Sequence, residues 1–198
     1  MQFSDFDALS FDCYGTLIDW ETGIWEALQP VVQRSQRSVS REEALVAFAE
    51  LESDAQATSP LDFYPHLLAR IFPELAKKFG VKSTLEDAQA FGQSVGNWPA
   101  FPDAAVSLHR LRKRYKLIIL SNVDVASFCE SAKQLEARFD YIFTAQEIGS
   151  YKPDPANFKF MARRLAEVGI SKMKTLHVAQ SLFHDHQEAA RQGFATCW

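Results

Sequence analysis

The chain has 198 residues, of which 47% are hydrophobic and 23% charged, so it can bury one full core and carry one small insertion. Its net charge of −4 and its lack of an extended basic segment argue against nucleic-acid binding. No run of about 18 apolar residues and no basic leader before an apolar stretch occurs, so we expect neither membrane insertion nor secretion. The three cysteines lie far apart and form no CxxC pair, which predicts a reducing cytoplasmic setting.

The predicted strands begin with residues 8–11, a short apolar run closed by a turn at Gly15, which is typical of a buried parallel strand. Similar runs cover 117–120, 141–144 and 175–178, and residues 195–198 are a candidate for a fifth. Helical patterns lie between them, over 104–114 with Asp103 as N-cap and over 155–168 with Gly169 as the stop. This alternation predicts an α/β fold with a parallel sheet and right-handed crossovers.

Residues 20–98 interrupt the alternation, because they contain at least three helix patterns and no convincing strand. One helix is expected to start at the capping box Ser40–Glu43, and a second box is formed by Ser83 and Glu86. The apolar face over 61–79 is expected to be broken in two by Pro73. We expect an inserted helical domain above the carboxyl edge of the sheet, with a hinge in the return linker over 92–102.

Polar residues follow each predicted strand at its carboxyl end, where parallel α/β sheets bind ligands. They are Asp12, Ser121, Asn122, Lys152, Gln180, Ser181 and Asp185. If the strands are parallel, these residues converge on one edge. Asp12 is then the candidate nucleophile, because a carboxylate at this edge can attack an electrophile.

Four motifs with this order and spacing give the chain a family resemblance over its whole length. They are Asp12-Cys-Tyr-Gly-Thr-Leu17, Leu120-Ser-Asn122, Tyr151-Lys-Pro-Asp154 and His177-Val-Ala-Gln-Ser-Leu-Phe-His-Asp185. The chain resembles the haloacid dehalogenase superfamily, and within it the type II 2-haloacid dehalogenases. This resemblance implies a hydrolase with a Rossmann-like α/β core, formed by residues 1–19 and 99–198, and a helical cap domain over 20–98.

The resemblance also implies a role for each motif. Asp12, Lys152 and Asp185 would be catalytic: Asp12 forms an aspartyl ester or acyl phosphate and Lys152 keeps it ionised. Asp185 would hold a water molecule or Lys152, or bind Mg²⁺, and as an alternative it caps a helix over 186–192. The expected substrate-binding residues are Tyr14, Thr16, Ser121, Asn122, Gln180 and Ser181.

Tyr14 decides which reaction is expected. Family phosphatases carry an aspartate at this position as general acid, and a phenol is a poor acid near pH 7. Gln180 replaces an acidic residue that would help to hold Mg²⁺. A halide leaves without protonation, so we expect cofactor-free hydrolytic dehalogenation of a small (S)-2-haloacid through an aspartyl ester, with no metal site.

Three departures from the dehalogenase pattern keep two alternatives open. The only nearby candidate for the halide-binding arginine of the cap is Arg41, Phe158 stands where a tyrosine is expected, and Gln180-Ser-Leu182 resembles the phosphatase spacing. The first alternative is a phosphatase-type hydrolase with Mg²⁺ held by Asp12 and Asp185. The second is a protein of the same fold that binds a ligand without turnover.

Several other residues complete the expectations. Cys13 is expected to pack in the core, and His184 to line the pocket or activate water. Trp20, Trp25, Phe48 and Tyr64 are candidates for an apolar pocket wall. The expected partner is a small acidic molecule. The chain end at Trp198, in the last predicted strand, leaves a sheet edge that favours a homodimer or reduced stability.

Overall fold

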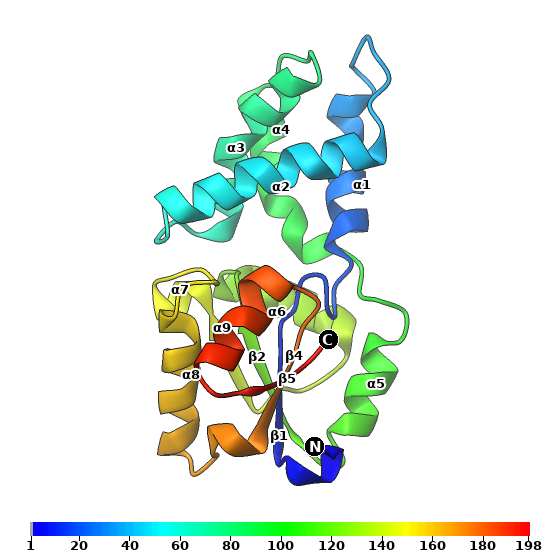
Figure 1. Cartoon of the computed structure of the whole chain (residues 1–198). Coiled ribbons are helices and arrows are strands. Elements are labelled where there is room, and N and C mark those ends of the chain that lie inside the picture. Colours follow the sequence, from blue (N-terminus) through cyan, green and yellow to red (C-terminus); the bar gives the residue numbers. More distant parts are fainter. Residues whose placement is uncertain (1) are drawn as a thin grey trace.

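A computed structural model of the protein describes residues 2–198, which form a parallel sheet with helices on both faces and a layer of helices above it (Figure 1). The sheet has five strands in the order β3-β2-β1-β4-β5, and every neighbouring pair is parallel. The predicted α/β fold class is thus confirmed. The strands are β1 (Ala8–Phe11), β2 (Lys116–Ser121), β3 (Tyr141–Thr144), β4 (Thr175–Val178) and β5 (Ala195–Cys197).

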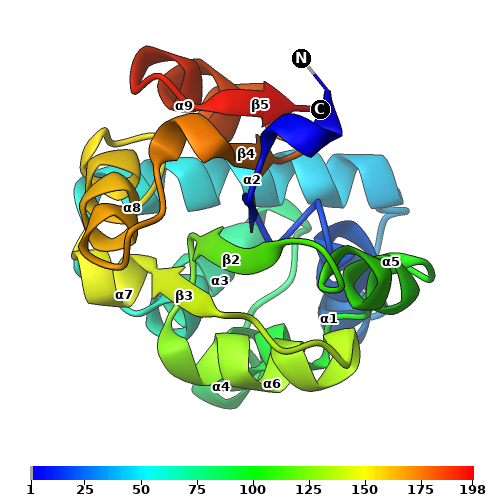
Figure 2. The ribbon, with the colours of Figure 1, turned by 90° about the horizontal axis from the view of Figure 1, so that it is seen from below.

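Strand β1 lies in the middle of the sheet, and its four residues are all buried. Successive side chains of a strand point to opposite faces. Ala8 belongs to the apolar cluster on the face of α8 (Ala156–Glu167) and α9 (Gln187–Arg191), whereas Leu9 and Phe11 belong to the cluster on the other face. Figure 2 shows α8 on one face of the sheet and α5 (Ala104–Leu111) on the other. The sheet therefore has two covered faces, as its apolar strands require.

The remaining helices of the sheet region lie before the first strand or between the strands. Helix α5 ends at Leu111, earlier than the predicted residue 114, and the side chain of its N-cap residue Asp103 makes no capping hydrogen bond. The others are α6 (Val125–Leu135), α7 (Ala145–Ile148), the short 3-10 helices η1 (Phe3–Asp5) and η3 (Lys172–Lys174), and a single turn of π-helix, η4 (Leu182–His186).

The helical layer, which we define as residues 20–97, stands over the carboxyl ends of the strands (Figure 1). It contains α1 (Trp20–Val32), α2 (Arg41–Thr58), α3 (Tyr64–Lys78), α4 (Leu85–Gly92) and the 3-10 helix η2 (Gln93–Asn97). The two chain segments that join it to the sheet region run side by side, because Ile18 and Ala100 form an antiparallel bridge and the Phe101 N–H donates to the Leu17 carbonyl at 2.9 Å. The predicted domain boundaries at 19/20 and 98/99 stay predictions.

Two expectations within the helical layer were wrong. Helix α3 runs through Pro73 without a break. Proline removes one helical hydrogen bond, but buried residues on both sides, such as Phe72 and Leu75, hold the helix in the layer. The capping box of α4 uses Thr84 and Asp87, one residue later than expected, because Thr84 is the residue with extended backbone before the helix.

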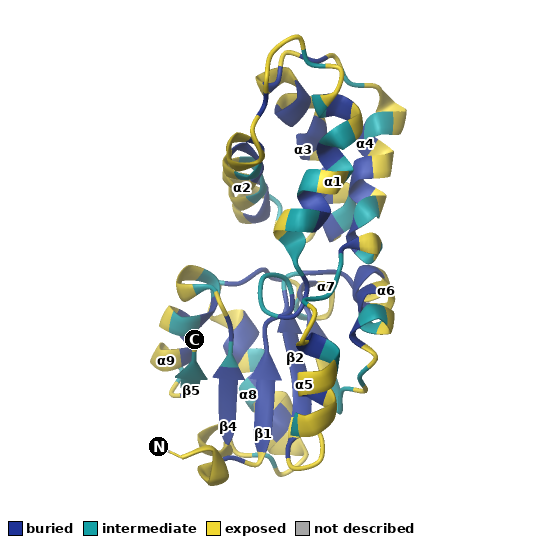
Figure 3. Cartoon of the chain, turned by 90° about the vertical axis from the view of Figure 1, so that its right-hand side faces the viewer, coloured by how far each residue is buried: buried dark blue, intermediate teal, exposed yellow. Residues whose placement is uncertain are grey.

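The core continues from the sheet into the helical layer. Figure 3 shows buried positions along the strands and along the inner sides of α1, α3 and α4. One cluster of buried side chains includes Phe11 of β1, Ile18 of the connection and Phe48 of α2. Cys13 is fully buried in this cluster, as expected.

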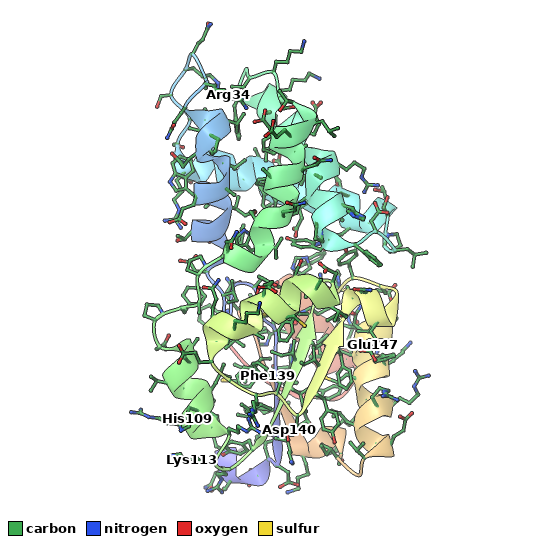
Figure 4. The ribbon with its side chains drawn as sticks, turned by 180° about the vertical axis from the view of Figure 1, so that it is seen from behind. Arg34, His109, Lys113, Phe139, Asp140 and Glu147 are labelled. Atoms are coloured by element: carbon green, nitrogen blue, oxygen red, sulfur yellow. The ribbon has the colours of Figure 1, made fainter. Side chains whose placement is uncertain are left out.

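Ion pairs at the two ends of the molecule join neighbouring helices and strands near their ends. Arg34 lies at the end of the helical layer that is remote from the sheet, where its guanidinium binds Asp87 at 2.7 Å (Figure 4). At the opposite end, Asp140 accepts from the Lys116 ammonium at 2.9 Å and from the Leu117 N–H at 3.0 Å. Among the helices of residues 2–198, none is long and apolar enough to cross a membrane.

Candidate active site

The three predicted catalytic residues meet at the carboxyl edge of the sheet. Asp12 follows β1 directly, Lys152 lies in the loop after α7, and Asp185 lies in η4. The Lys152 ammonium binds Asp12 Oδ1 at 2.8 Å and Asp185 Oδ1 at 2.7 Å, and it also donates to the Leu120 carbonyl at 3.0 Å. All three side chains are buried, so this is a desolvated ion network.

Asn122 fixes the loop that carries Lys152. Its Oδ1 accepts from the Lys152 backbone N–H at 2.6 Å, and its Nδ2 donates to the Lys152 carbonyl at 3.0 Å. The same Nδ2 lies 3.3 Å from Gln56 Oε1 on α2. Asn122 therefore joins the end of β2 to the lysine loop and to the helical layer.

A second row of buried side chains lies behind Asp185, and the sequence alone did not reveal it. His177 Nε2 lies 2.9 Å from Asp185 Oδ1, and since a carboxylate only accepts, Nε2 carries the hydrogen. Ser10 Oγ lies 2.9 Å from the other ring nitrogen, on the strand that pairs with β4 in register. The Asp185 carboxylate is engaged with His177 and Lys152 and does not cap the helix that follows, because α9 begins after His186 and has no side-chain cap.

The pKa values of the network follow from burial and from the shared cation. Burial raises the pKa of Asp12 above its ordinary value, and Lys152 only partly offsets this. Burial also disfavours ionised Asp185, but Lys152 and the hydrogen bond from His177 outweigh it and hold the pKa of that carboxyl below its usual range. For Lys152, burial lowers the pKa, and the two carboxylates more than compensate, so the ammonium stays charged.

The turn after Asp12 supplies the next contacts. The Thr16 hydroxyl donates to Asp12 Oδ2 at 3.0 Å and accepts from the Gln180 backbone N–H at 3.1 Å. The Tyr14 hydroxyl lies 2.9 Å from Ser131 Oγ on α6. Burial raises the pKa of Tyr14 well above 10, so its phenol is a very weak acid in this position.

A cavity of about 270 Å³ opens above Asp12, between the strand ends and the helical layer. Residues from both parts line it. They are Asp12, Tyr14, Trp20, Phe48, Ala49, Glu52, Ser53, Gln56, Tyr64, Asn122, Lys152, Gln180, Ser181, His184 and Asp185.

The structure thus brings most of the predicted site residues to one cavity. Thr16 and Ser121 are not among its lining residues, and the buried Ser121 hydroxyl has no hydrogen-bond partner within residues 2–198. Of the aromatic candidates, Trp20, Phe48 and Tyr64 line the cavity and Trp25 does not. The functional roles of these residues stay predictions.

Glu52 and Gln56 of α2 also line the cavity, and sequence reasoning missed them. Glu52 Oε1 accepts from the Tyr64 hydroxyl at 2.7 Å and from Gln56 Nε2 at 2.8 Å. The only signal in the sequence was their spacing of four residues, which places both on the side of α2 that carries Phe48. Polar residues at this spacing are ordinary on helix surfaces, so the pattern did not single them out.

Three further residues that the sequence analysis singled out are Arg41, Phe158 and His184, and only His184 lines the cavity. Arg41 does not line this cavity, because its guanidinium lies at the surface and donates to Thr22 Oγ1 at 3.1 Å. Phe158 is fully buried and packs its ring edge to face on His177, with ring centroids 5.0 Å apart. His184 lines the cavity, and burial lowers its pKa below the ordinary value.

The two predicted ligands of Mg²⁺ do not form a site that suits this ion. Lys152 already binds both Asp12 and Asp185, and the neutral Gln180 stands where another acid would be needed. Within residues 2–198, no group of three or more histidine, cysteine, aspartate or glutamate side chains is placed to hold a metal. The Mg²⁺ alternative therefore receives no support from the donor set.

Comparison with known proteins agrees with this arrangement. A sequence model described as haloacid dehalogenase-like hydrolase matches residues 6–181. The chain belongs to this family, and it is a hydrolase. No curated protein sequence matches the chain.

Solved structures with the same fold include dehalogenases and one magnesium-bound protein. The L-2-haloacid dehalogenase PA0810 is 23% identical, with a TM-score of 0.80 over 96% of this chain and 82% of that one. The L-2-haloacid dehalogenase of Xanthobacter autotrophicus with chloropropionic acid covalently bound is 18% identical, with a TM-score of 0.80 over 96% and 76%. The putative hydrolase YfnB of Bacillus subtilis, bound to magnesium, is 18% identical, with a TM-score of 0.79 over 98% and 88%. At these identities the likeness establishes the fold.

Proposed function

We propose that the protein hydrolyses the carbon–halogen bond of a small (S)-2-haloacid through an ester of Asp12. The observation that carries the proposal is that the Tyr14 hydroxyl is buried and hydrogen-bonded. This hydroxyl is engaged with Ser131, and burial raises its pKa well above 10, so it does not serve as the acid that protonates an alkoxide leaving group. A halide leaves without a proton, and the reaction therefore needs no acid at this position.

In the first step, a carboxylate oxygen of Asp12 attacks C2 of the substrate. The carbon–halogen bond breaks, the halide leaves with the bonding electron pair, and C2 is inverted. Lys152 favours this step because its ammonium, at 2.8 Å, keeps Asp12 ionised in a buried position. The substrate carboxylate is assigned to the end of β2, where Asn122 lines the cavity.

In the second step, water attacks the side-chain carbonyl carbon of Asp12. The ester bond breaks at that carbon, the 2-hydroxyacid leaves, and Asp12 returns to the carboxylate as one proton is released. His184 is the proposed acceptor of the water proton, because it lines the cavity and its lowered pKa keeps the imidazole neutral near pH 7. The helical layer supplies the far wall that limits access of bulk water, which is the role proposed for a cap.

The test is halide release from (S)- and (R)-2-chloropropanoate, measured with Mg²⁺ and with a chelator, beside phosphate release from p-nitrophenyl phosphate. We expect chloride from the S enantiomer at the same rate under both conditions. Asp12→Asn should abolish the release, whereas Asp7→Asn, at an exposed position before β1, should retain it. Release of phosphate from p-nitrophenyl phosphate that needs Mg²⁺ and stops with the chelator would contradict the proposal and favour phosphatase chemistry.

A further inference from the structure

Glu52 presents a carboxyl group to the cavity from the helical layer. Two hydrogen bonds hold its Oε1, from the Tyr64 hydroxyl at 2.7 Å and from Gln56 Nε2 at 2.8 Å. Its second oxygen, Oε2, accepts no hydrogen bond from any side chain or backbone group between residues 2 and 198. The side chain is thus fixed in orientation, with one acceptor left over.

The surroundings of Glu52 are largely apolar and leave Oε2 without a donor. Phe48 and Trp20 line the same cavity with apolar rings, 6.0 Å apart between centroids. Burial raises the pKa of Glu52 to about 7, so the carboxyl is partly protonated at neutral pH and becomes fully ionised only at higher pH. Glu52 is half-buried and lines the cavity, and no lining residue donates a hydrogen bond to Oε2, so this oxygen is available to a donor group of a ligand.

The other charges of the cavity decide which end of a substrate can approach Glu52. Lys152 is the one ammonium among the lining residues, and it lies with Asp12 and Asp185 at the sheet end of the cavity, so the cation that can attract a substrate carboxylate is at that end. His184 adds no charge near neutral pH, because its pKa is lowered. An acidic substrate group beside Glu52 would be repelled, whereas a donor group would be attracted.

We propose that Glu52 is a specificity-determining residue, which accepts a hydrogen bond from a hydroxyl or ammonium group at the end of the substrate remote from C2. The substrate class is then a 2-haloacid with such a donor on its side chain. This inference rests on the proposed dehalogenation for the reacting end. The carboxylate of the substrate lies toward β2 and its donor group toward α2.

The test uses three inert probes that lack a halogen: propanoate, 3-hydroxypropanoate and 3-aminopropanoate. Calorimetry at about pH 8.5, where Glu52 is ionised, measures their affinities for the wild type, Glu52→Gln and Glu50→Gln. Glu50 is the matched control, because it lies on the same helix but is exposed and binds Lys78 at 3.2 Å.

We expect the wild type and Glu50→Gln to bind 3-aminopropanoate about tenfold or more tighter than propanoate, a ratio typical of one charge-assisted hydrogen bond. 3-Hydroxypropanoate should lie between them. Glu52→Gln keeps an acceptor for Tyr64 but loses the charge, so its preference should vanish. Glu52→Met, neutral and of similar length, is a second variant should the first lower the melting temperature.

Equal affinities of the wild type for the three probes would overturn the inference. So would a preference that survives in a folded Glu52 variant. These outcomes are separate from failure of the proposed function, because the probes cannot react. A protein that releases no halide from any 2-haloacid could still show the Glu52-dependent preference, and an active dehalogenase could lack it.

Discussion

Lys152 binds Asp12 and Asp185 at almost the same distance, 2.8 and 2.7 Å, but the pKa values of the two carboxyl groups are shifted in opposite directions. Asp185 receives a further hydrogen bond from His177, and its pKa falls below the ordinary value. Among the described residues 2–198, the Thr16 hydroxyl is the one further donor to the Asp12 side chain, and burial leaves the pKa of Asp12 raised. The proposed nucleophile, Asp12, is therefore the carboxyl of the two that is harder to ionise.

This inequality predicts the acidic limb of the pH profile. Asp12 reacts as the carboxylate, so kcat/KM for halide release should fall as the pH drops through the raised pKa of Asp12, above the ordinary value of 3.8. Lys152→Met, which removes the stabilising charge, should move any residual activity to still higher pH, whereas Lys133→Met at the surface should leave the limb in place. A limb at or below the ordinary aspartate value would contradict this account of Asp12.

His177 predicts an effect on stability. His177→Leu removes one of the two donors to Asp185 Oδ1 and the partner of the buried Ser10 hydroxyl, and the unfolding free energy should fall by about 1–3 kcal/mol. His177→Gln can still donate from its side-chain amide and should restore part of the loss. His109 on the outer side of α5 is the matched control (Figure 4). Urea unfolding near pH 7 checks the series, and an unchanged midpoint for His177→Leu would contradict the role given to this contact.

At the scale of elements, the close approach of α3 and α4 fixes the wall that carries Tyr64. Gly92 lies against the backbone of α3, where an added Cβ would be 2.3 Å from the Pro65 carbonyl oxygen and 3.2 Å from Ala69 Cβ. Pro65 follows Tyr64 directly, and the Tyr64 hydroxyl holds Glu52. The packing of two helices is therefore linked to the position of a cavity carboxyl.

Gly92→Ala should separate α3 from α4, because the opposing atom belongs to the backbone and cannot rotate away. We expect a loss of about 1–3 kcal/mol in the unfolding free energy, the usual range for overpacking. Gln89→Ala, at an exposed position of the same helix, should change it little. Chemical denaturation of both variants tests the prediction, which fails if the alanine at position 92 is as stable as the glycine.

The elements also show what sequence patterns can predict. The short apolar runs at 8–11 and 175–178 have no helical alternative, because each is bounded by turn residues, and they form β1 and β4 with these bounds. The helix break predicted at Pro73 was wrong, since tertiary packing of α3 outweighs the hydrogen bond that the proline removes. The expectation that polar residues after parallel strands meet at one edge of the sheet correctly brought Asp12 and Lys152 together. It could not reveal His177 or Glu52, because their contacts depend on strand register and on how α2 lies over the sheet.

At the scale of the whole molecule, one buried cluster joins the helical layer to the sheet. Leu9 and Phe11 of β1 belong to the same cluster as Phe72 of α3, and Trp98 lies between the two parts. The Trp98 ring packs edge to face on Tyr14, with centroids 5.5 Å apart, and on Tyr64 at 6.3 Å. The two-domain division and the homodimer stay predictions, but the core itself is continuous.

This continuity predicts that the chain unfolds as one cooperative unit. The calorimetric enthalpy should equal the van't Hoff enthalpy, since neither part can lose its structure without exposing the shared cluster. Differential scanning calorimetry measures both quantities. Two separate transitions would show that the helical layer and the sheet region are independent units, against the reasoning from their common core.

The central claim is that Asp12 forms a covalent ester, and isotopic labelling in a single turnover tests it most directly. The enzyme in excess reacts with (S)-2-chloropropanoate in heavy-oxygen water, and mass spectrometry then examines the peptide that contains Asp12 and the product. We predict the heavy isotope in the Asp12 carboxylate and ordinary oxygen in the hydroxyl group of the product. Unlabelled Asp12 beside a labelled product would contradict the account, because water would then have attacked the substrate directly.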